Sequence, residues 1–318
     1  LCLDADSGRI LWNTEVFSGG TGKGVQMHSK NSRASATPLI EGGRLYVHFG
    51  PEGTAGLDLS GKILWRNSSL NYSPVHGNGG SPIVVEDALI FHGDGASDPY
   101  VVALNKANGN VLWKVKRDTD ATKTFSFSTP LLITINGQKQ VLSPGSNVLG
   151  SFDPKTGREI WRVQYDGYSV VPRPVFGHGL VYFSTGFDNP EVMAVRPDGR
   201  GDVTSSHVAW TVRRSAPNTP SLLLVGDELY MLSDAGIASC LDAQTGRVHW
   251  QERIGGNCSA SPIYGDGKIY FQNEEGLGVV IKAGKGFEKL ASNPLKERTL
   301  SSYAVGAGAL FIRTERQL

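Results

Sequence analysis

The chain has 318 residues, a formal net charge of +1 and a hydrophobic fraction of 39%. The near balance of charge excludes a strong general attraction to nucleic acid or to an anionic membrane surface, and no apolar run reaches the ~18 residues that a transmembrane helix needs. Its 40 glycines, 16 prolines and three cysteines are typical of many short strands joined by turns, without a disulfide framework or a C-x-x-C motif.

The chain opens on the phrase "CLDADSGRILW", which returns near its far end as "CLDAQTGRVHW". In both copies a short apolar run leads through an Asp-x-x-Ser/Thr-Gly turn into a second run that ends on Trp. Asp can accept a hydrogen bond from its own turn, and Gly supplies the positive φ, so the phrase predicts a hairpin. A seventh copy, "IKAGKGFEKL", has no Trp. All six tryptophans of the chain occur in this context: Trp12, Trp65, Trp113, Trp161, Trp210 and Trp250.

A second hairpin phrase alternates with the first, beginning with "TPLIEGGRLYVHF" at residues 37–49. In this phrase Pro opens the first strand in five copies, where its missing N–H is tolerated: Pro38, Pro82, Pro130, Pro174 and Pro262. Two hairpins make a four-stranded antiparallel unit, and the repeat interval of about 40–50 residues is typical of a propeller or a solenoid. The sequence therefore predicts an all-β fold, a β-propeller of seven blades, with each Trp on an outermost strand and its N–H bonded to a neighbouring repeat.

The two ends of the chain are complementary. The first residues supply the third and fourth strands of a blade, and the last residues, "SSYAVGAGALFIRTERQL", supply the first and second. We expect residues 1–318 to form a single propeller domain, closed by pairing of the N- and C-terminal strands in one blade, because pairing removes two open sheet edges. The alternative is that the chain, which does not begin with Met, belongs to an eight-bladed parent.

The phrase A-x-D-x-x-T-G-x-x-x-W resembles the tryptophan-docking motif of the pyrroloquinoline quinone (PQQ) repeat propellers. "LDADSGRILW", "FDPKTGREIW" and "LDAQTGRVHW" carry it best, whereas "LNKANGNVLW" has Asn105 in place of the Asp. That superfamily includes quinoprotein alcohol dehydrogenases and BamB-type outer-membrane assembly lipoproteins, so the resemblance implies work outside the cytoplasm, in the periplasm or at the cell surface. Quinoprotein dehydrogenases carry adjacent cysteines, a calcium ion held by Glu and Asn, and an Asp base; this chain has no adjacent cysteines and no Trp outside the repeat.

Polar, varied loops precede the innermost strand of each repeat, and they are the predicted ligand site, at the mouth of the propeller channel. The segment from Asn13 to Ala34 is the longest of them and carries a compact set of cationic and amide donors suited to a carboxylate or phosphate. The alternative is that these side chains bond only channel waters and loop carbonyls. The candidate ligand-binding residues are His28, Lys30, Asn31, Arg33, His76, Asn78, Arg173, Asn218 and Asn257.

Other chemistries have weaker support in the sequence. His48 and His92 stand at equivalent places in adjacent repeats, with Asp94 near, but no third or fourth ligand is evident, so no metal site is predicted. Cys258 is interpreted as a small buried apolar residue rather than a nucleophile. A polysaccharide-cleaving site needs a carboxylate pair, for which Asp98, Asp188 and Glu191 are the nearest candidates. No catalytic residue is predicted.

We expect a monomeric, non-enzymatic binding or assembly scaffold that takes a protein or polysaccharide ligand at its loop-rich face and does not bind nucleic acid. A partner that adds a strand to an open blade edge is a further mode of binding. No cofactor is predicted. The alternative is a quinoprotein-type oxidoreductase acting on an alcohol or sugar with PQQ and Ca²⁺, or an enzyme acting on polysaccharides.

Overall fold

The computed structural model describes residues 1–18 and 27–318, so part of the predicted loop from Asn13 to Ala34 lies outside the described residues. The chain divides into two compact units. Unit 1 comprises Leu1–Gly145 and Gly150–Glu159, and unit 2 comprises Ser146–Leu149 and Ile160–Leu318. Whether these units form the single predicted domain stays a prediction.

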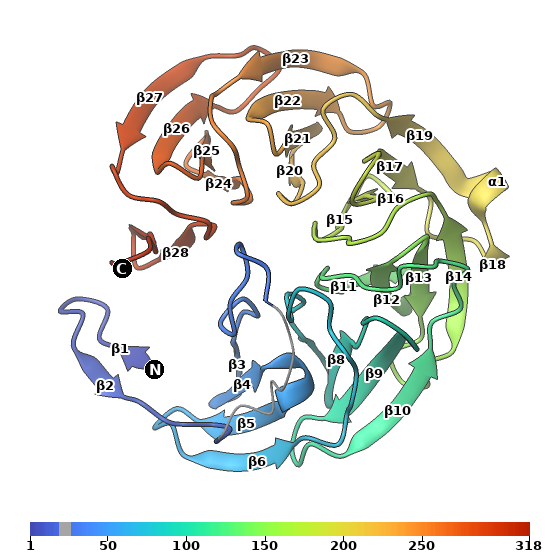
Figure 1. Cartoon of the computed structure of the whole chain (residues 1–318). Helices are drawn as coiled ribbons and strands as arrows, with labels where there is room; N and C mark the ends of the chain where they lie inside the picture. Colours follow the sequence, from blue (N-terminus) through green and yellow to red (C-terminus); the bar gives the residue numbers. More distant parts are fainter. Residues whose placement is uncertain (19–26) are drawn as a thin grey trace. The chain divides into compact units, whose positions relative to one another are not determined.

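Unit 1 holds a hairpin and two four-stranded antiparallel sheets, each with its strands in chain order (Figure 1). The hairpin is β1 (Cys2–Leu3) and β2 (Ile10–Trp12). The first sheet contains β3 (Leu39–Glu41), β4 (Arg44–His48), β5 (Thr54–Asp58) and β6 (Ile63–Asn67), with the 3-10 helix η1 (Gly50–Glu52) between β4 and β5. The second contains β7 (Ile83–Val85), β8 (Ala88–His92), β9 (Tyr100–Asn105) and β10 (Val111–Lys116).

The boundary between the units falls within one sheet, whose strand order is β11-β12-β13-β14-β18. Its strands are β11 (Leu131–Ile135), β12 (Gln138–Gly145), β13 (Val148–Phe152), β14 (Glu159–Gln164) and β18 (Gly201–Asp202). This sheet has five strands where the repeat predicts four, because β18 comes from the connection that precedes Trp210. That connection also contains α1 (Thr204–His207), a single helical turn.

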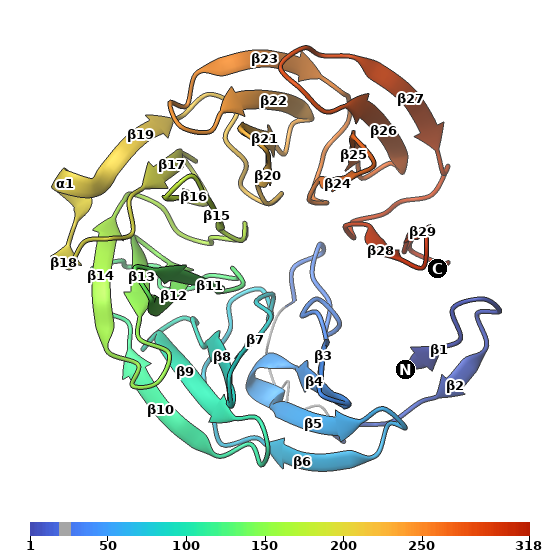
Figure 2. The same cartoon turned by 180° about the vertical axis from the view of Figure 1, so that it is seen from behind.

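Unit 2 continues with three four-stranded antiparallel sheets and a last hairpin (Figure 2). The first sheet contains β15 (Val175–Gly177), β16 (Leu180–Ser184), β17 (Val192–Val195) and β19 (Val208–Val212). The second contains β20 (Leu223–Val225), β21 (Glu228–Leu232), β22 (Ile237–Asp242) and β23 (Val248–Arg253). The third contains β24 (Ile263–Gly265), β25 (Lys268–Gln272), β26 (Leu277–Lys282) and β27 (Lys289–Pro294), and the hairpin is β28 (Ala304–Gly306) and β29 (Ala309–Phe311).

Burial within a sheet follows the position of the strand. The middle strands β8 and β9 read "ALIFH" and "YVVALN" and are buried almost throughout, whereas β10 alternates between exposed and half-buried residues. A strand covered on both faces needs a continuous apolar run, and an outer strand needs apolar residues on one face only. The four-stranded antiparallel unit predicted from the repeat is therefore confirmed.

The repeat tryptophans connect one repeat to the next along the chain, as predicted. Five of their indole N–H groups donate to a backbone carbonyl in the turn of the next repeat, at 2.9–3.1 Å. Trp65, for example, donates to the carbonyl of Lys106, and its ring packs on Gly109, the motif glycine of the next turn. Gly61, Gly157 and Gly246 meet the preceding Trp ring in the same way. The motif is thus structural, pairing each Trp with a glycine in the following turn.

The strand order bears on two parts of the predicted arrangement, the position of Trp161 and the pairing of the chain ends. Trp161 does not lie on an outermost strand, because β18 pairs outside β14; this part of the prediction is wrong. The hairpins β1-β2 and β28-β29 are two separate two-stranded sheets, so the pairing of the chain ends and the count of seven blades stay predictions.

Candidate functional site

Two of the predicted inner-strand loops meet in unit 1 around His76. The imidazole rings of His28 and His76 are edge to face with their centroids 5.5 Å apart. The His76 carbonyl accepts hydrogen bonds from the Asn31 side chain at 2.8 Å and from the His28 backbone N–H at 3.2 Å. His76 itself has a φ of +68°, a conformation that costs a non-glycine residue free energy and is enriched at functional sites. The structure therefore brings these three predicted residues together.

A third inner-strand loop joins this group through rings that the sequence interpretation missed. His76 lies 5.6 Å from Phe125, edge to face, and Phe125 lies 6.0 Å from Phe127. We call His28, His76, Phe125 and Phe127 the ring row. The loop "TFSFSTP" contains the signal, because two aromatic residues alternate there in a stretch otherwise made of small polar residues. Such ring contacts hold loops in a fixed arrangement and contribute ~0.5–1.5 kcal/mol each beyond burial.

The other predicted residues of unit 1 have local partners. The Asn78 side-chain oxygen accepts a hydrogen bond from the Tyr72 hydroxyl at 2.9 Å. Lys30 is exposed, and its backbone N–H donates to Nδ1 of His28 at 3.2 Å. The Arg33 guanidinium forms an ion pair with Glu52 at 3.2 Å. A carboxylate or phosphate ligand, as predicted here, would have to compete with the Glu52 carboxylate for the Arg33 guanidinium.

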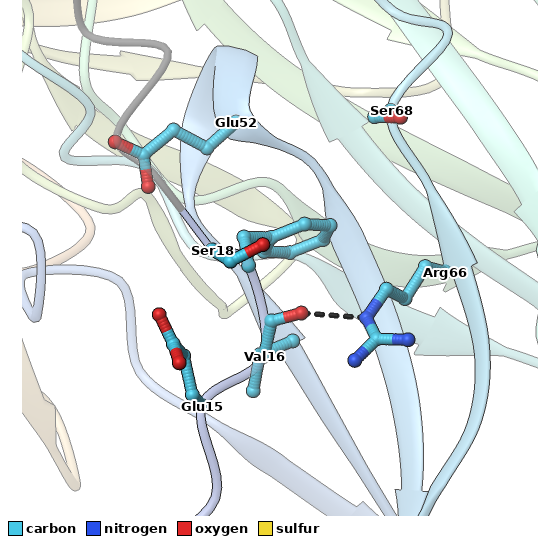
Figure 3. A pocket seen from close by; sticks show the side chains of 7 residues that line it. Glu15, Val16, Ser18, Glu52, Arg66 and Ser68 are labelled. Atoms are coloured by element: carbon cyan, nitrogen blue, oxygen red, sulfur yellow. Dashed lines mark hydrogen bonds between the residues drawn. The ribbon is translucent and has the colours of Figure 1, made fainter.

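A cavity of about 560 Å³ lies beside Glu52, lined by Glu15, Val16, Phe17, Ser18, Arg66 and Ser68 (Figure 3). The Arg66 guanidinium donates to the Val16 carbonyl at 2.6 Å, which holds the segment after β2 against β6. Two carboxylates line this cavity together with one guanidinium. Their charge disfavours an additional anion, because like charges repel at short range in a partly desolvated hollow.

The three predicted residues of unit 2 are not gathered by side-chain contacts. Arg173 and Asn257 are exposed. The backbone N–H of Arg173 donates to Ser221 Oγ, and the Asn257 carbonyl accepts from the backbone of Glu274. The Asn218 backbone donates to the Asp234 carboxylate at 2.7 Å, and the Asp234 carbonyl accepts from the Cys258 N–H at 2.9 Å. Asp234 thus connects two inner-strand loops, a role that its place in a turn did not indicate.

A buried ionic network lies in unit 1 between β8, β12 and the residues after β10. The Arg117 guanidinium contacts both Asp94 carboxylate oxygens, at 3.0 and 3.2 Å, and also donates to the carbonyl and hydroxyl of Ser143. Ser126 donates to the same carboxylate at 2.7 Å. The Arg117 and Asp94 side chains are 1% and 0% exposed, so each charge depends on the other for its stabilisation.

His92 completes this network. Its Nε2 lies 2.6 Å from the Ser128 carbonyl, and since a carbonyl only accepts, Nε2 carries the proton. Burial lowers the pKa of His92, with Arg117 adding to the effect and Asp94 opposing it. The neutral ring then directs Nδ1 toward the Asp94 carboxylate at 3.3 Å, a contact that the guanidinium of Arg117 makes tolerable. The sequence placed Asp94 near His92 but did not point to Arg117.

His48 is the second buried imidazole, and it makes stability depend on pH. Burial lowers the pKa of His48 to about 3, whereas an unfolded histidine titrates near 6.5. Between these values the unfolded chain binds a proton at His48 that the native chain does not, so this residue alone lowers stability by about 1.4 kcal/mol per pH unit on acidification below pH 6.5. Buried His92, whose pKa is also lowered, adds to the slope. We expect urea unfolding at pH 7.0, 6.0 and 5.0 to show this slope.

The matched variants for that prediction are His48→Gln and His178→Gln. His48→Gln removes one of two buried imidazoles with a lowered pKa and is expected to reduce the slope between pH 6 and 5 by about 1.4 kcal/mol per pH unit, leaving the contribution of His92. His178 is partly exposed beside Asp227, so His178→Gln should leave the slope of the wild type. An unchanged slope in His48→Gln would contradict the assignment.

Within residues 1–18 and 27–318, no group of three or more His, Cys, Asp or Glu residues is arranged to hold a metal ion. Asp98 lies 4.0 Å from Lys116, and Glu191 pairs with Arg213 at 2.6 Å. The polysaccharide candidates Asp98 and Glu191 thus each have a cationic neighbour.

Comparison with known proteins identifies the family. Residues 1–198 and 202–289 match the family described as Outer membrane protein assembly factor BamB. The chain belongs to this family. Its fold is accordingly the β-propeller of PQQ-like repeats, consistent with the four-stranded sheets and docked tryptophans above, and the resemblance identified from the repeat is confirmed.

Relatives of this chain include a BamB protein and a subunit of a methanol dehydrogenase. BamB of Yersinia pestis is 20% identical over 98% of this chain and 65% of its own length. Subunit 1 of the cytochrome c methanol dehydrogenase of Methylobacterium organophilum is 29% identical over 41% of this chain, but the match spans only 23% of that enzyme. The crystal structure of BamB from Moraxella catarrhalis superposes with a TM-score of 0.67 at 14% identity, covering 88% of this chain and 80% of that one.

Proposed function

We propose that this chain is an extracytoplasmic binding scaffold for protein assembly, and that the ring row and its neighbours hold a protein ligand. The observation that carries the proposal is the junction of three inner-strand loops, at which buried Phe125 contacts His76 and Phe127, and His76 contacts His28. Exposed Lys30 and Arg33 lie on the first of these loops. Aromatic and arginine side chains on a fixed surface are enriched at protein–protein interfaces. Membership in the BamB family supports an assembly role at a coarse level.

The alternative activity is a quinoprotein-type oxidation, favoured by the local match to methanol dehydrogenase. The residues of this chain do not fit the group that such enzymes use. None of its three cysteines forms a disulfide, and Cys240 and Cys258 are buried. Five indole N–H groups are bonded to the turns of the next repeat, and Trp161 is fully buried. We therefore do not propose PQQ-dependent oxidation for this chain.

Location and state of assembly belong to the same proposal. No helix among the described residues is long and apolar enough to cross a membrane. The family supports a place outside the cytoplasm, in the periplasm or at the outer membrane. We propose a monomer that binds its protein ligand at the inner-strand loops, with a polysaccharide ligand as the competing possibility.

The test uses three probes on the purified chain: an unfolded outer-membrane β-barrel polypeptide labelled with a fluorophore, soluble dextran, and PQQ with Ca²⁺. We expect the polypeptide to bind and the double variant Arg33→Ala/His76→Ala to weaken that binding by about 10-fold or more. Arg214→Ala, an exposed arginine in unit 2, is the matched control and should bind as the wild type does. A melting-temperature shift with PQQ and Ca²⁺, together with dye reduction by an alcohol, would support the oxidoreductase instead.

A further inference from the structure

β14 shows how an outer sheet edge of this chain receives an additional strand. β18 pairs with β14 in parallel, with Gly201 opposite Trp161 and Asp202 opposite Arg162 (Figures 1 and 2). The Val203 N–H donates to the Arg162 carbonyl at 2.9 Å. The Thr204 hydroxyl oxygen accepts from the backbone N–H of Gln164 at 2.9 Å. The backbone groups of the first and third residues after the Trp are thus the ones that β14 offers to the incoming segment.

Side chains add an acidic preference to this pairing. The Asp202 carboxylate accepts from the Gln164 side chain at 3.0 Å and from the Thr204 hydroxyl and backbone N–H. The two bonds from Thr204 lower the pKa of Asp202, with a smaller contribution from Arg162. Trp161 is 0% exposed, and Ile160 before it is 5% exposed. The acidic residue opposite the first position after the Trp thus bonds to the side chain of the third, which favours an acidic segment at this edge.

β10 has the same geometry without an added strand. Trp113, Val115 and Arg117 point their backbone groups toward β9 and the residue before it, as the bond from the Arg117 N–H to the Pro99 carbonyl shows. Because these groups alternate along a strand, those of Lys114 and Lys116 face outward. Leu112, the counterpart of Ile160, is 50% exposed. The backbone positions that β18 occupies on β14 are therefore open on β10, and the residue before the Trp is exposed there instead of buried.

The β10 edge carries one more basic residue than the β14 edge at the corresponding positions. Lys114 and Lys116 occupy the positions of Arg162 and Gln164, the first and third after the Trp. The Lys114 ammonium lies 3.9 Å from the centroid of the Tyr100 ring, and that of Lys116 lies 4.0 Å from the exposed Asp98 carboxylate. An exposed pair at that distance contributes little, so Lys116 can serve an incoming anion. Lys114 is exposed and keeps its charge over the Tyr100 ring, so it adds to the positive potential at this edge.

On two other outer strands, corresponding side chains already donate hydrogen bonds within the chain. On β6, Arg66 donates to the Val16 carbonyl. On β23, Gln251 donates to Ser239 and Arg253 to the Ala235 carbonyl. Among these edges, β10 combines open backbone groups, an exposed leucine and two outward lysines.

We propose that the outer edge of β10 binds an extended acidic segment of a partner protein as a parallel strand, by the contacts that β14 makes with Gly201–Thr204. Strand addition supplies main-chain hydrogen bonds, and side chains at alternate positions supply specificity. The two lysines repel a second copy of the same edge and select an acidic segment. This surface lies on the outer strand, apart from the inner-strand loops, and the proposal does not rest on the function proposed above.

The test uses the octapeptide GEGDVTSS, an acidic form of residues 199–206, with a fluorescent label, and the intact chain. We expect saturable binding that weakens with salt, a loss of affinity of about 10-fold or more in Lys114→Glu/Lys116→Glu, and no change in Lys289→Glu, an exposed lysine on β27. Hydrogen exchange should slow at the amides of Lys114 and Lys116 when the peptide binds.

Three outcomes would overturn the proposal. The first is equal affinity in the double variant and the wild type. The second is equal binding of GKGKVTSS, in which both acidic residues are replaced by lysine. The third is undiminished binding of a peptide methylated on the valine nitrogen, the counterpart of the Val203 N–H, because main-chain pairing requires that donor.

Discussion

Replacing Arg117 with Met is expected to lower the free energy of unfolding by about 3–5 kcal/mol. The substitution keeps most of the side-chain volume but removes the guanidinium that contacts both oxygens of the Asp94 carboxylate. Asp94 would stay buried with only the Ser126 hydroxyl and the His92 ring beside it. An ionised carboxylate without its counterion inside a protein is far more costly than the same carboxylate in water.

Urea unfolding followed by far-ultraviolet circular dichroism measures this change. Arg9→Met is the matched control, because Arg9 is an exposed residue of the same unit, and it should cost less than ~0.5 kcal/mol. The double variant Asp94→Asn/Arg117→Met removes both charges and is expected to be more stable than Arg117→Met alone. If the two variants are equally destabilised, the loss comes from packing or from Ser143, and not from the stranded charge.

The same network shows why part of the site could not be predicted from the sequence. Repeat positions can be recognised from the sequence, because the tryptophans, turn glycines and strand-opening prolines recur at intervals of about 40–50 residues. Arg117 does not stand at a conserved place of the repeat: the fourth residue after the Trp is Ser69 in one copy, Tyr165 in another, and an exposed arginine, Arg214, in a third. A single basic residue after an outer strand looks like a surface residue until the fold places it against Asp94.

β18 was missed for a related physical reason. The segment "RPDGRGDVTSSHVAW" keeps the Trp but lengthens the turn before it. Turn chemistry predicts where a hairpin reverses and carries no information on whether a two-residue stretch such as Gly201–Asp202 will find an open edge. That pairing depends on the exposed backbone of β14, a tertiary property.

The loop site was predicted in part because chemistry and position agreed there. His28, Asn31 and His76 were selected as polar residues on loops before innermost strands, and the structure joins them directly. Phe125 and Phe127 were not predicted, because an apolar ring on a loop carries no hydrogen-bonding group that would mark it as a ligand contact. Aromatic rings on such loops fix the geometry in which the polar groups are presented, so both kinds of residue belong in one candidate site.

Replacing the turn glycine Gly109 with Ala is expected to lower the free energy of unfolding by about 2–5 kcal/mol, of which only a part is backbone strain. Gly109 has a φ of +77°, where an L-residue loses about 1–2 kcal/mol. A Cβ at this position would also overlap the ring of Trp65, which donates to the nearby Lys106 carbonyl. Overpacking of this kind costs typically 1–3 kcal/mol.

Gly137→Ala separates the two contributions. Gly137 lies in the same unit with a φ of +76°, and nothing stands within 4 Å of where its Cβ would be. Urea unfolding of the two variants should therefore show the strain alone for Gly137→Ala and strain plus Trp displacement for Gly109→Ala. Indole fluorescence should change only in the second. Equal costs and unchanged fluorescence would mean that Trp65 adjusts freely, and that the recurring glycine serves the turn without serving the tryptophan. A larger loss at Gly109 instead means that each turn of the repeat is shaped by the indole of the repeat before it, which explains why Gly and Trp recur together along the chain.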